Sequence, residues 1–150
     1  MRLKAIAAAV LVAGLGVVGV AIAAQEDGTH EARSALMKKV GGAAGAMAAI
    51  AKGEKPYDAE VVKASLMTIA ETAKVFPDQF KPGTEKGDKA ASPKIWEDHA
   101  DFKARAAKLS DDADKLLAQL PADPAGVGAA MKALGANCGG CHEKFRIKTE

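Results

Sequence analysis

The stretch Cys138-Gly139-Gly140-Cys141-His142 lies near the end of the 150-residue chain and contains both of its cysteines. Its pattern, C-x-x-C-H, is typical of the covalent attachment of a c-type haem. In a helix, residues at i, i+3 and i+4 share one face, so Cys138, Cys141 and His142 would present two thiols and one imidazole to the same flat group. Each thiol can form a thioether with a haem vinyl group, and the imidazole can ligate the iron. We therefore expect one covalent haem c, with His142 as a metal ligand.

Three other interpretations of this stretch have less support. A thioredoxin-like dithiol belongs to a βαβ unit, and the chain shows almost no strand pattern. A structural zinc site has four ligands, so in a chain with three histidines it would need the distant His30 or His99. A disulfide between Cys138 and Cys141 would close a very short loop and would stabilise the chain little.

The start of the chain is typical of a secretion signal. A basic beginning precedes an uncharged apolar run that ends in the small residues Ala21-Ile22-Ala23-Ala24. This pattern predicts a signal peptide over residues 1–23, cleaved after Ala23 or Ala24, and a mature domain over residues 24–150. The run is long enough to span a bilayer, but its Ala- and Gly-rich composition favours cleavage over a retained anchor. We therefore expect export to the bacterial periplasm and no membrane anchor after cleavage.

Charge and composition exclude several function classes. The chain has 21 basic and 19 acidic residues, and the loss of Arg2 and Lys4 with the signal would leave it near neutral. Nucleic acid is not an expected partner, because no basic patch with interleaved aromatic residues appears. No Ser/His/Asp spacing or phosphate-binding glycine loop appears either, so we do not expect an enzyme. The paired carboxylates Asp111 and Asp112 are expected on a solvated helix face.

Apolar residues recur at helical spacing in four segments, at about residues 29–52, 58–76, 92–120 and 123–147. Thr29 and Asp58 are the expected N-caps of the first two helices, and Ser92-Pro93 and Asp123-Pro124 begin the others. Gly126 and Gly128 are expected to delay the last helix.

One long connection, over residues 77–92, is rich in Pro, Gly and charge, and no regular element is predicted there. The remaining links are short. We therefore predict an all-α fold, an antiparallel four-helix bundle with the covalent haem near one end.

A haem motif at the end of a short four-helix chain resembles cytochrome c′ and its low-spin, methionine-ligated relatives. The resemblance covers residues 28–150. It is carried by Arg33-Ser34-Ala35-Leu36-Met37, Gly53-Glu54-Lys55-Pro56-Tyr57-Asp58, Pro82-Gly83-Thr84-Glu85, Ser92-Pro93-Lys94-Ile95-Trp96, and Cys138-Gly139-Gly140-Cys141-His142 with Phe145-Arg146.

The resemblance implies roles for residues on the proximal side of the haem. Cys138 and Cys141 would be the thioether attachments and His142 the proximal ligand. Arg146, one turn after His142, resembles the basic residue that lies beside the proximal imidazole, where a cation would set the charge around that ligand or pair with a haem propionate. The alternative for Arg146 is an ordinary surface arginine.

On the distal side, Met37 decides the mechanism that the resemblance implies. It lies four residues after Arg33, which resembles the first-helix arginine near the distal haem face, whereas Thr84 and Glu85 resemble loop residues near the haem edge. In the five-coordinate branch, the residue at the Met37 position blocks the iron without ligating it, and only small molecules such as NO or CO enter. In the low-spin branch its sulfur ligates the iron, which favours the reduced state. Methionine is compatible with both branches, while Arg33 is more typical of the five-coordinate one.

The favoured function is a periplasmic carrier of single electrons between redox partner proteins. The alternative is a protein that binds NO or CO, with Met37 blocking the distal site. The resemblance also implies a homodimer formed through the first two helices. His99 is expected to be a packing histidine rather than an iron ligand, and Met47, Met67 and Met131 are expected to be core residues.

Overall fold

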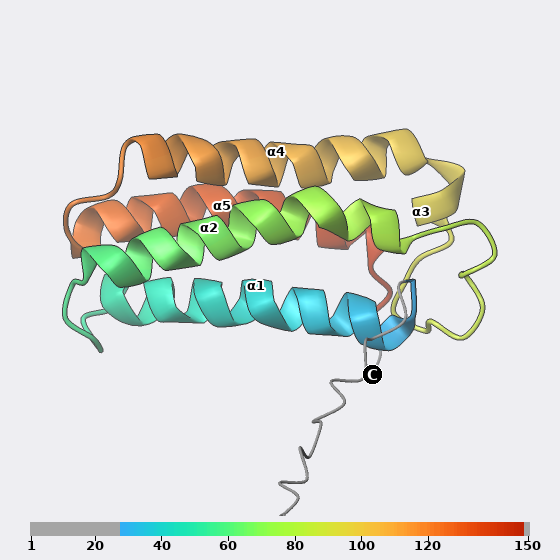
Figure 1. Cartoon of the computed structure of the whole chain (residues 1–150), viewed down its shortest axis with the longest axis horizontal. Helices are drawn as coiled ribbons and strands as arrows, with labels where there is room; N and C mark the ends of the chain where they lie inside the picture. The colour runs from blue at the N-terminus through green and yellow to red at the C-terminus, as the bar shows by residue number, and fades with distance from the viewer. Residues whose placement is uncertain (1–27, 149–150) are drawn as a thin grey trace, which may run out of the picture.

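The computed structural model describes residues 28–148, so the expected signal peptide and its cleavage site lie outside the described residues. Four long helices form an antiparallel bundle (Figure 1): α1 (His30–Ala51), α2 (Ala59–Val75), α4 (His99–Ala118) and α5 (Pro124–Phe145). Because α1 and α4 each pack against both α2 and α5, the four helices form a closed ring. The prediction of an all-α four-helix bundle is confirmed. No helix between residues 28 and 148 has the length and apolar character needed to cross a membrane.

The predicted capping residues begin three of these helices. The side chains of Thr29, Asp58 and Asp123 accept hydrogen bonds from first-turn amides of α1, α2 and α5. The expectation that Gly126 and Gly128 delay α5 is wrong, because this helix starts directly after Asp123. The Asp123 carboxylate accepts the Gly126 amide at 2.7 Å, and this bond compensates for the weak helix propensity of glycine.

The third predicted helix is not continuous. It consists of a short α3 (Lys94–Glu97), a break at Asp98, and α4. Asp98 has φ −127° and ψ 55°, and its side chain accepts the Asp101 amide, so Asp98 is the N-cap of a new helix. The apolar stripe does not reveal the break, because Trp96 and Phe102 on its two sides pack into the same cluster.

Two further expectations, one about α2 and one about the segment directly after it, are wrong. The segment Phe76–Gln79 forms a 3-10 turn, η1, directly after α2, although residues from 77 onward were expected to have no regular element. Met67 was expected in the core but is 42% exposed on α2. Its neighbours Leu66 and Ile69 fill the buried face of α2 and leave Met67 on the outer side.

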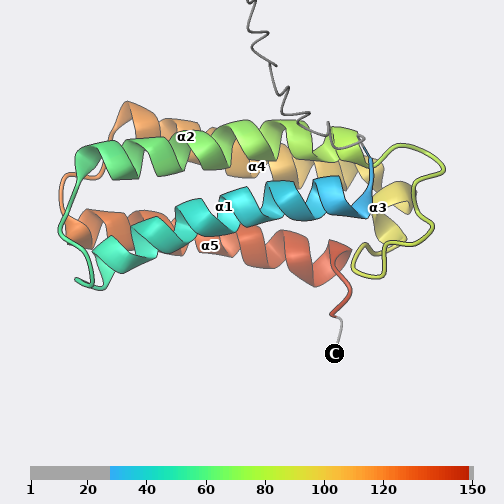
Figure 2. The same cartoon turned by 60° about the horizontal axis from the view of Figure 1, so that its bottom comes forward.

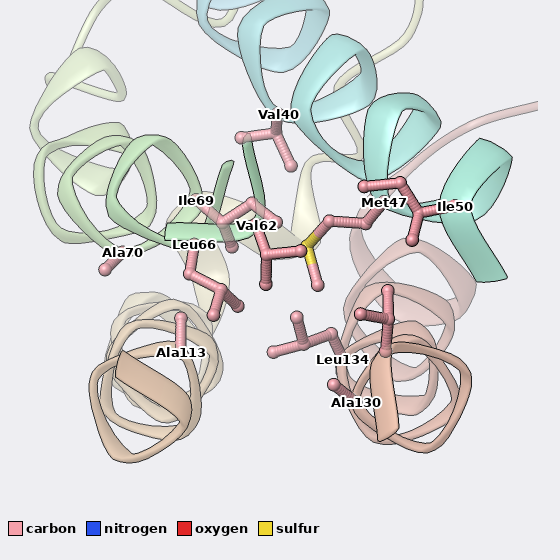
Figure 3. Packing of buried hydrophobic residues seen from close by; sticks show 11 residues of the cluster. Val40, Met47, Ile50, Val62, Leu66, Ile69, Ala70, Ala113, Ala130 and Leu134 are labelled. Atoms are coloured by element: carbon pink, nitrogen blue, oxygen red, sulfur yellow. The ribbon is translucent and has the colours of Figure 1, made fainter. Parts of the chain in front are cut away.

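Side chains from all four long helices meet on the bundle axis (Figure 3). Met47 of α1 is fully buried there, as expected, in a cluster completed by Val40, Ile50, Val62, Leu66, Ile69, Ala70, Ala113, Val127, Ala130 and Leu134. A second, mainly aromatic cluster surrounds the last residue of α5. Its buried members are Phe80, Ile95, Phe102 and Phe145, and Phe76, Ala91, Trp96 and Cys141 pack against them. The aromatic cluster therefore lies beside the C-x-x-C-H stretch.

Candidate haem site

The C-x-x-C-H stretch occupies the last turns of α5, and the helix continues through it to Phe145. Because the stretch is helical, Cys138, Cys141 and His142 project from one face. Both thiols are free and half-buried, and Cys141 packs against the aromatic cluster. The structure thus presents two unpaired sulfurs and an imidazole side by side.

The protonation states of these groups suit haem attachment. Burial raises the pKa of the Cys138 thiol and, against the opposing charge of Arg105, that of the Cys141 thiol. Both thiols are therefore protonated and resist unwanted oxidation at neutral pH. Partial desolvation, helped by the charge of Arg146, lowers the pKa of His142. A lowered pKa favours the neutral imidazole, which is the form that binds a metal.

These donors fit a covalent haem better than the competing sites. Between residues 28 and 148, no group of three His, Cys, Asp or Glu side chains is arranged to hold a metal ion, so a structural zinc has no ligand set in that part of the chain. An iron porphyrin needs only one protein nitrogen and the two thiols that α5 supplies.

An open hollow lies on the outer face of α5 beside His142. Its lining residues are Gly139, His142, Glu143, Arg146 and Lys148. Arg146, which the resemblance linked to the proximal imidazole, is exposed and close enough to act on the charge of His142. The surroundings of His142 are therefore basic on this side.

A group of charged residues that the sequence did not single out ties the motif to α4. Arg105 donates from Nη1 to the Gly140 carbonyl at 2.9 Å and from Nε to Asp101 at 2.8 Å. Lys144 donates to Asp98 at 2.6 Å and to Asp101 at 2.9 Å. The four-residue spacing of Asp101 and Arg105 was the available signal, but it predicts only a pair on one helix and not the contact with Gly140.

Asp112 of α4 makes a second contact with α5, at Asn137, about one turn before Gly140. Asp111 and Asp112 were expected on a solvated face. Asp111 is exposed, whereas the side chain of Asp112 is only 22% exposed because it contacts α5. Asp112 accepts from Asn137 at 2.9 Å, from Lys108 at 2.6 Å and from Lys115 at 3.0 Å. Because Asn137 directly precedes Cys138, Asp112 fixes the start of the haem-binding turns on α4.

On the other side of the bundle, α1 runs beside α5 in the opposite direction (Figure 2). The first half of α1, which contains Met37, therefore accompanies the last half of α5, which contains the motif. Met37 is half-buried and packs against the main core. The structure thus brings Met37 and His142 to facing helices at the same end of the bundle.

Arg33, one turn before Met37, is directed toward the long connection rather than toward α5. Its side chain is 4% exposed. It donates to the Gln79 carbonyl at 2.9 Å, to the hydroxyl and carbonyl of Thr84, and to Asp88 at 3.0 Å. The guanidinium also lies 4.2 Å from the centre of the Phe80 ring. Arg33 and Thr84 are therefore brought together.

Glu85 and His99 stand apart from this group. Glu85 is exposed, and its carboxylate accepts the Gly83 amide at 3.1 Å within its own turn. Its own backbone amide, the Gly83 amide and the charge of Arg33 together lower the pKa of Glu85. His99 has its Nδ1 3.2 Å from the Ile95 carbonyl and its ring 6.0 Å from that of Phe102, which is consistent with a packing role.

Comparison with known proteins identifies the family. The model of the family described as cytochrome C' matches residues 29–146, which include all four long helices and the motif. The chain belongs to the cytochrome c′ family. It is thus a class II c-type cytochrome with one covalent haem c, and it takes part in electron transfer.

Named relatives of this cytochrome support the assignment. A cytochrome c-556 of Agrobacterium tumefaciens (strain apple 185) is 66% identical over 125 residues, which cover 83% of this chain and 99% of the relative. The structure of cytochrome c′ from Rhodopseudomonas palustris superposes with a TM-score of 0.77 and 38% identity, covering 84% of this chain and 100% of that one. A nitric oxide complex of a variant cytochrome c prime from Alcaligenes xylosoxidans has a TM-score of 0.68 and 34% identity, covering 79% and 93%.

Proposed function

We propose that this cytochrome is a periplasmic one-electron carrier in which Cys138 and Cys141 bind the haem, His142 is the proximal ligand and Met37 is the sixth ligand. One observation carries the proposal. The three motif side chains project from one face of α5, and Met37 lies on the neighbouring helix, α1, at the same end of the bundle. When bound, the haem supplies a ferric/ferrous couple that stores one electron.

The chain's own residues would hold this site rigid in both oxidation states. Arg105 and Lys144 tie the motif turns to the start of α4, and Asp112 ties Asn137 to its middle. A carrier benefits from such fixed ligands, because any ligand movement between oxidation states would add to the barrier for electron transfer. His142 stays neutral and available as a donor, and Arg146 contributes a positive charge beside it.

The state of Arg33 supports Met37 as a ligand. An arginine that served a vacant distal pocket would keep donors free for a bound molecule. Here the Gln79 carbonyl, Thr84 and Asp88 accept hydrogen bonds from all three guanidinium nitrogens. The thioether of Met37 is then the candidate donor of α1, and a soft sulfur ligand favours ferrous iron and raises the reduction potential.

The alternative is a five-coordinate cytochrome that binds NO or CO, with Met37 blocking the distal site. The similarity to a structure determined as a nitric oxide complex favours this second candidate. The two candidates differ in coordination, so the ferrous absorption spectrum with and without CO separates them. A narrow low-spin α band that CO changes slowly supports ligation, whereas a broad high-spin spectrum that CO changes at once supports the vacant site.

The attachment residues have their own test. Replacement of both Cys138 and Cys141 by Ser should leave no covalent haem in a pyridine haemochrome assay, and replacement of His142 by Gly should leave the haem attached with an altered spectrum. Covalent haem in the double cysteine variant would refute the attachment.

Location and assembly complete the proposal. The expected signal over residues 1–23 would export the chain to the periplasm, where it would exchange electrons with redox partner proteins and would not act as an enzyme. Fractionation of the native host tests the location. Sedimentation of the haem-loaded protein tests the homodimer through α1 and α2.

A further inference from the structure

Asp88 is the centre of a buried hydrogen-bond network in the connection between η1 and α3. Its side chain is 5% exposed. One carboxylate oxygen accepts the Ala90 and Ala91 amides at 3.0 and 3.2 Å and lies 3.0 Å from Nδ1 of His30. The other accepts Nη1 of Arg33 at 3.0 Å. Asp88 thus joins the first turns of α1 to the residues that directly follow Asp88 in the connection.

That segment is in turn bonded to the end of α5. The Ser92 amide donates to the Phe145 carbonyl at 3.0 Å, and the Ile147 amide donates to the Ala90 carbonyl at 2.8 Å. These bonds flank an isolated antiparallel bridge. Phe145 is three residues after His142, so the backbone that directly follows Asp88 is connected to the end of the helix that carries the motif.

The two attachments lie at the same end of the bundle. In Figures 1 and 2, the connection closes the end where α1 begins and α5 finishes. Arg33 is one turn before Met37 on α1, and Phe145 is about one turn after His142 on α5. A continuous path of hydrogen bonds therefore runs from the helix that carries Met37 to the helix that carries His142.

We propose that Asp88 is a positioning residue that holds α1 and α5 at a fixed separation, and that it would thereby keep the Met37 sulfur within reach of the iron that His142 would bind. This inference rests on the proposed function, because it takes Met37 as the sixth ligand. Asp88 also neutralises the Arg33 guanidinium, which is buried against Phe80. Loss of Asp88 would leave that cation without its charge partner and would release the Ala90–Ser92 segment. The start of α1 could then move away from α5, and Met37 would leave the iron more often.

The test compares three variants of the haem-loaded protein. Asp88→Ala removes the charge and the hydrogen bonds, and Asp88→Asn removes the charge but keeps an acceptor for the Ala90 and Ala91 amides. Asp78→Asn is the control, since Asp78 is an exposed carboxylate of η1 with no hydrogen bond or ion pair in the described part of the chain. If Asp88→Ala does not fold, Asp88→Asn carries the test.

Two measurements are made on each protein. The first is the rate of CO binding to the ferrous form, which depends on the fraction of molecules whose Met37 has left the iron. We expect an increase of about tenfold or more in Asp88→Ala, a smaller increase in Asp88→Asn and no change in the control. The second is hydrogen exchange of the Ser92 and Ile147 amides, which should become faster in the Asp88 variants.

The outcomes separate this inference from the proposed function. Faster CO binding together with faster amide exchange in the Asp88 variants supports the inference about Asp88. An unchanged CO rate overturns it, whether or not the amides exchange faster, because Asp88 then does not control Met37. If the unaltered protein binds CO as fast as Met37→Ala does, the proposed coordination fails, and so does this inference. Amide exchange would still report whether Asp88 ties the two helices.

Discussion

Replacement of Arg33 by Met should destabilise the protein strongly, because it breaks a buried ion pair. The side chains of Arg33 and Asp88 are 4% and 5% exposed, and their charged atoms are 3.0 Å apart. Removing one partner of a buried pair typically costs 3–5 kcal/mol, on the order of a third of the stability of a small domain. In the variant, the Asp88 carboxylate would still accept hydrogen bonds from the Ala90 and Ala91 amides. We therefore expect a loss at the lower end of this range, about 3 kcal/mol.

The assay is urea unfolding of the haem-loaded protein followed by circular dichroism. With a slope of about 1.5 kcal/mol per molar urea, the midpoint should fall by roughly 2 M. The double variant Arg33→Met, Asp88→Asn completes a mutant cycle, and it should lose less than the two single variants together, because neither charge is then left alone. The argument would be refuted if each single variant lost less than about 1 kcal/mol of unfolding free energy and the double variant lost the sum of the two.

Three further predictions concern the core, the α4–α5 contact and the attachment. Met47→Ala should cost about 2–5 kcal/mol, because Met47 is fully buried in the main cluster, yet it should leave the haem spectrum unchanged; an altered spectrum would mean that Met47 lies at the iron. The hydrogen bonds from Lys108, Asn137 and Lys115 hold the pKa of Asp112 well below its usual range, so its stabilising effect exists above the ordinary carboxyl pKa and is lost as the pH falls through the lowered one. Asp112→Asn should therefore lower the melting temperature at neutral pH and converge with the unaltered protein in acid, while the exposed neighbour variant Asp111→Asn should follow the unaltered protein at every pH. Cys138→Ser should retain one thioether through Cys141, which mass spectrometry of the unfolded protein would detect as a haem adduct; an adduct that survives in the double Cys→Ser variant would contradict the assignment.

Much of the fold was predictable, because local signals and the overall arrangement agree. Thr29, Asp58 and Asp123 cap their helices through side-chain geometry that a few neighbouring residues determine. The helical spacing of apolar residues then predicts which faces are buried, and short links predict antiparallel neighbours. The motif itself specifies the face of α5 that receives the haem.

The parts that were not predictable depend on contacts between distant residues. The break at Asp98 follows from the ion pair with Lys144, from the cap of α4 and from the packing of Trp96 and Phe102, none of which alters the apolar periodicity. The role of Arg33 depends on a connection about fifty residues later, and its spacing from Met37 suggests only a shared helix face.

The attachment of α5 to α4 was missed for the same reason. Asp112 and Asn137 are far apart in the sequence, and each is unremarkable in its own helix. Arg105 reaches a backbone carbonyl, an acceptor that every residue has and that no motif marks. Such contacts become visible only when two helices are placed together.

The most direct test of the central claim is the ferrous absorption spectrum of the haem-loaded protein and of its Met37→Ala variant, each recorded with and without CO. If Met37 ligates the iron opposite His142, the unaltered protein will show a narrow low-spin α band and slow CO uptake, and the variant will be high-spin and bind CO at once. Identical spectra and CO rates in the two proteins would contradict the claim, because Met37 would then lie away from the iron.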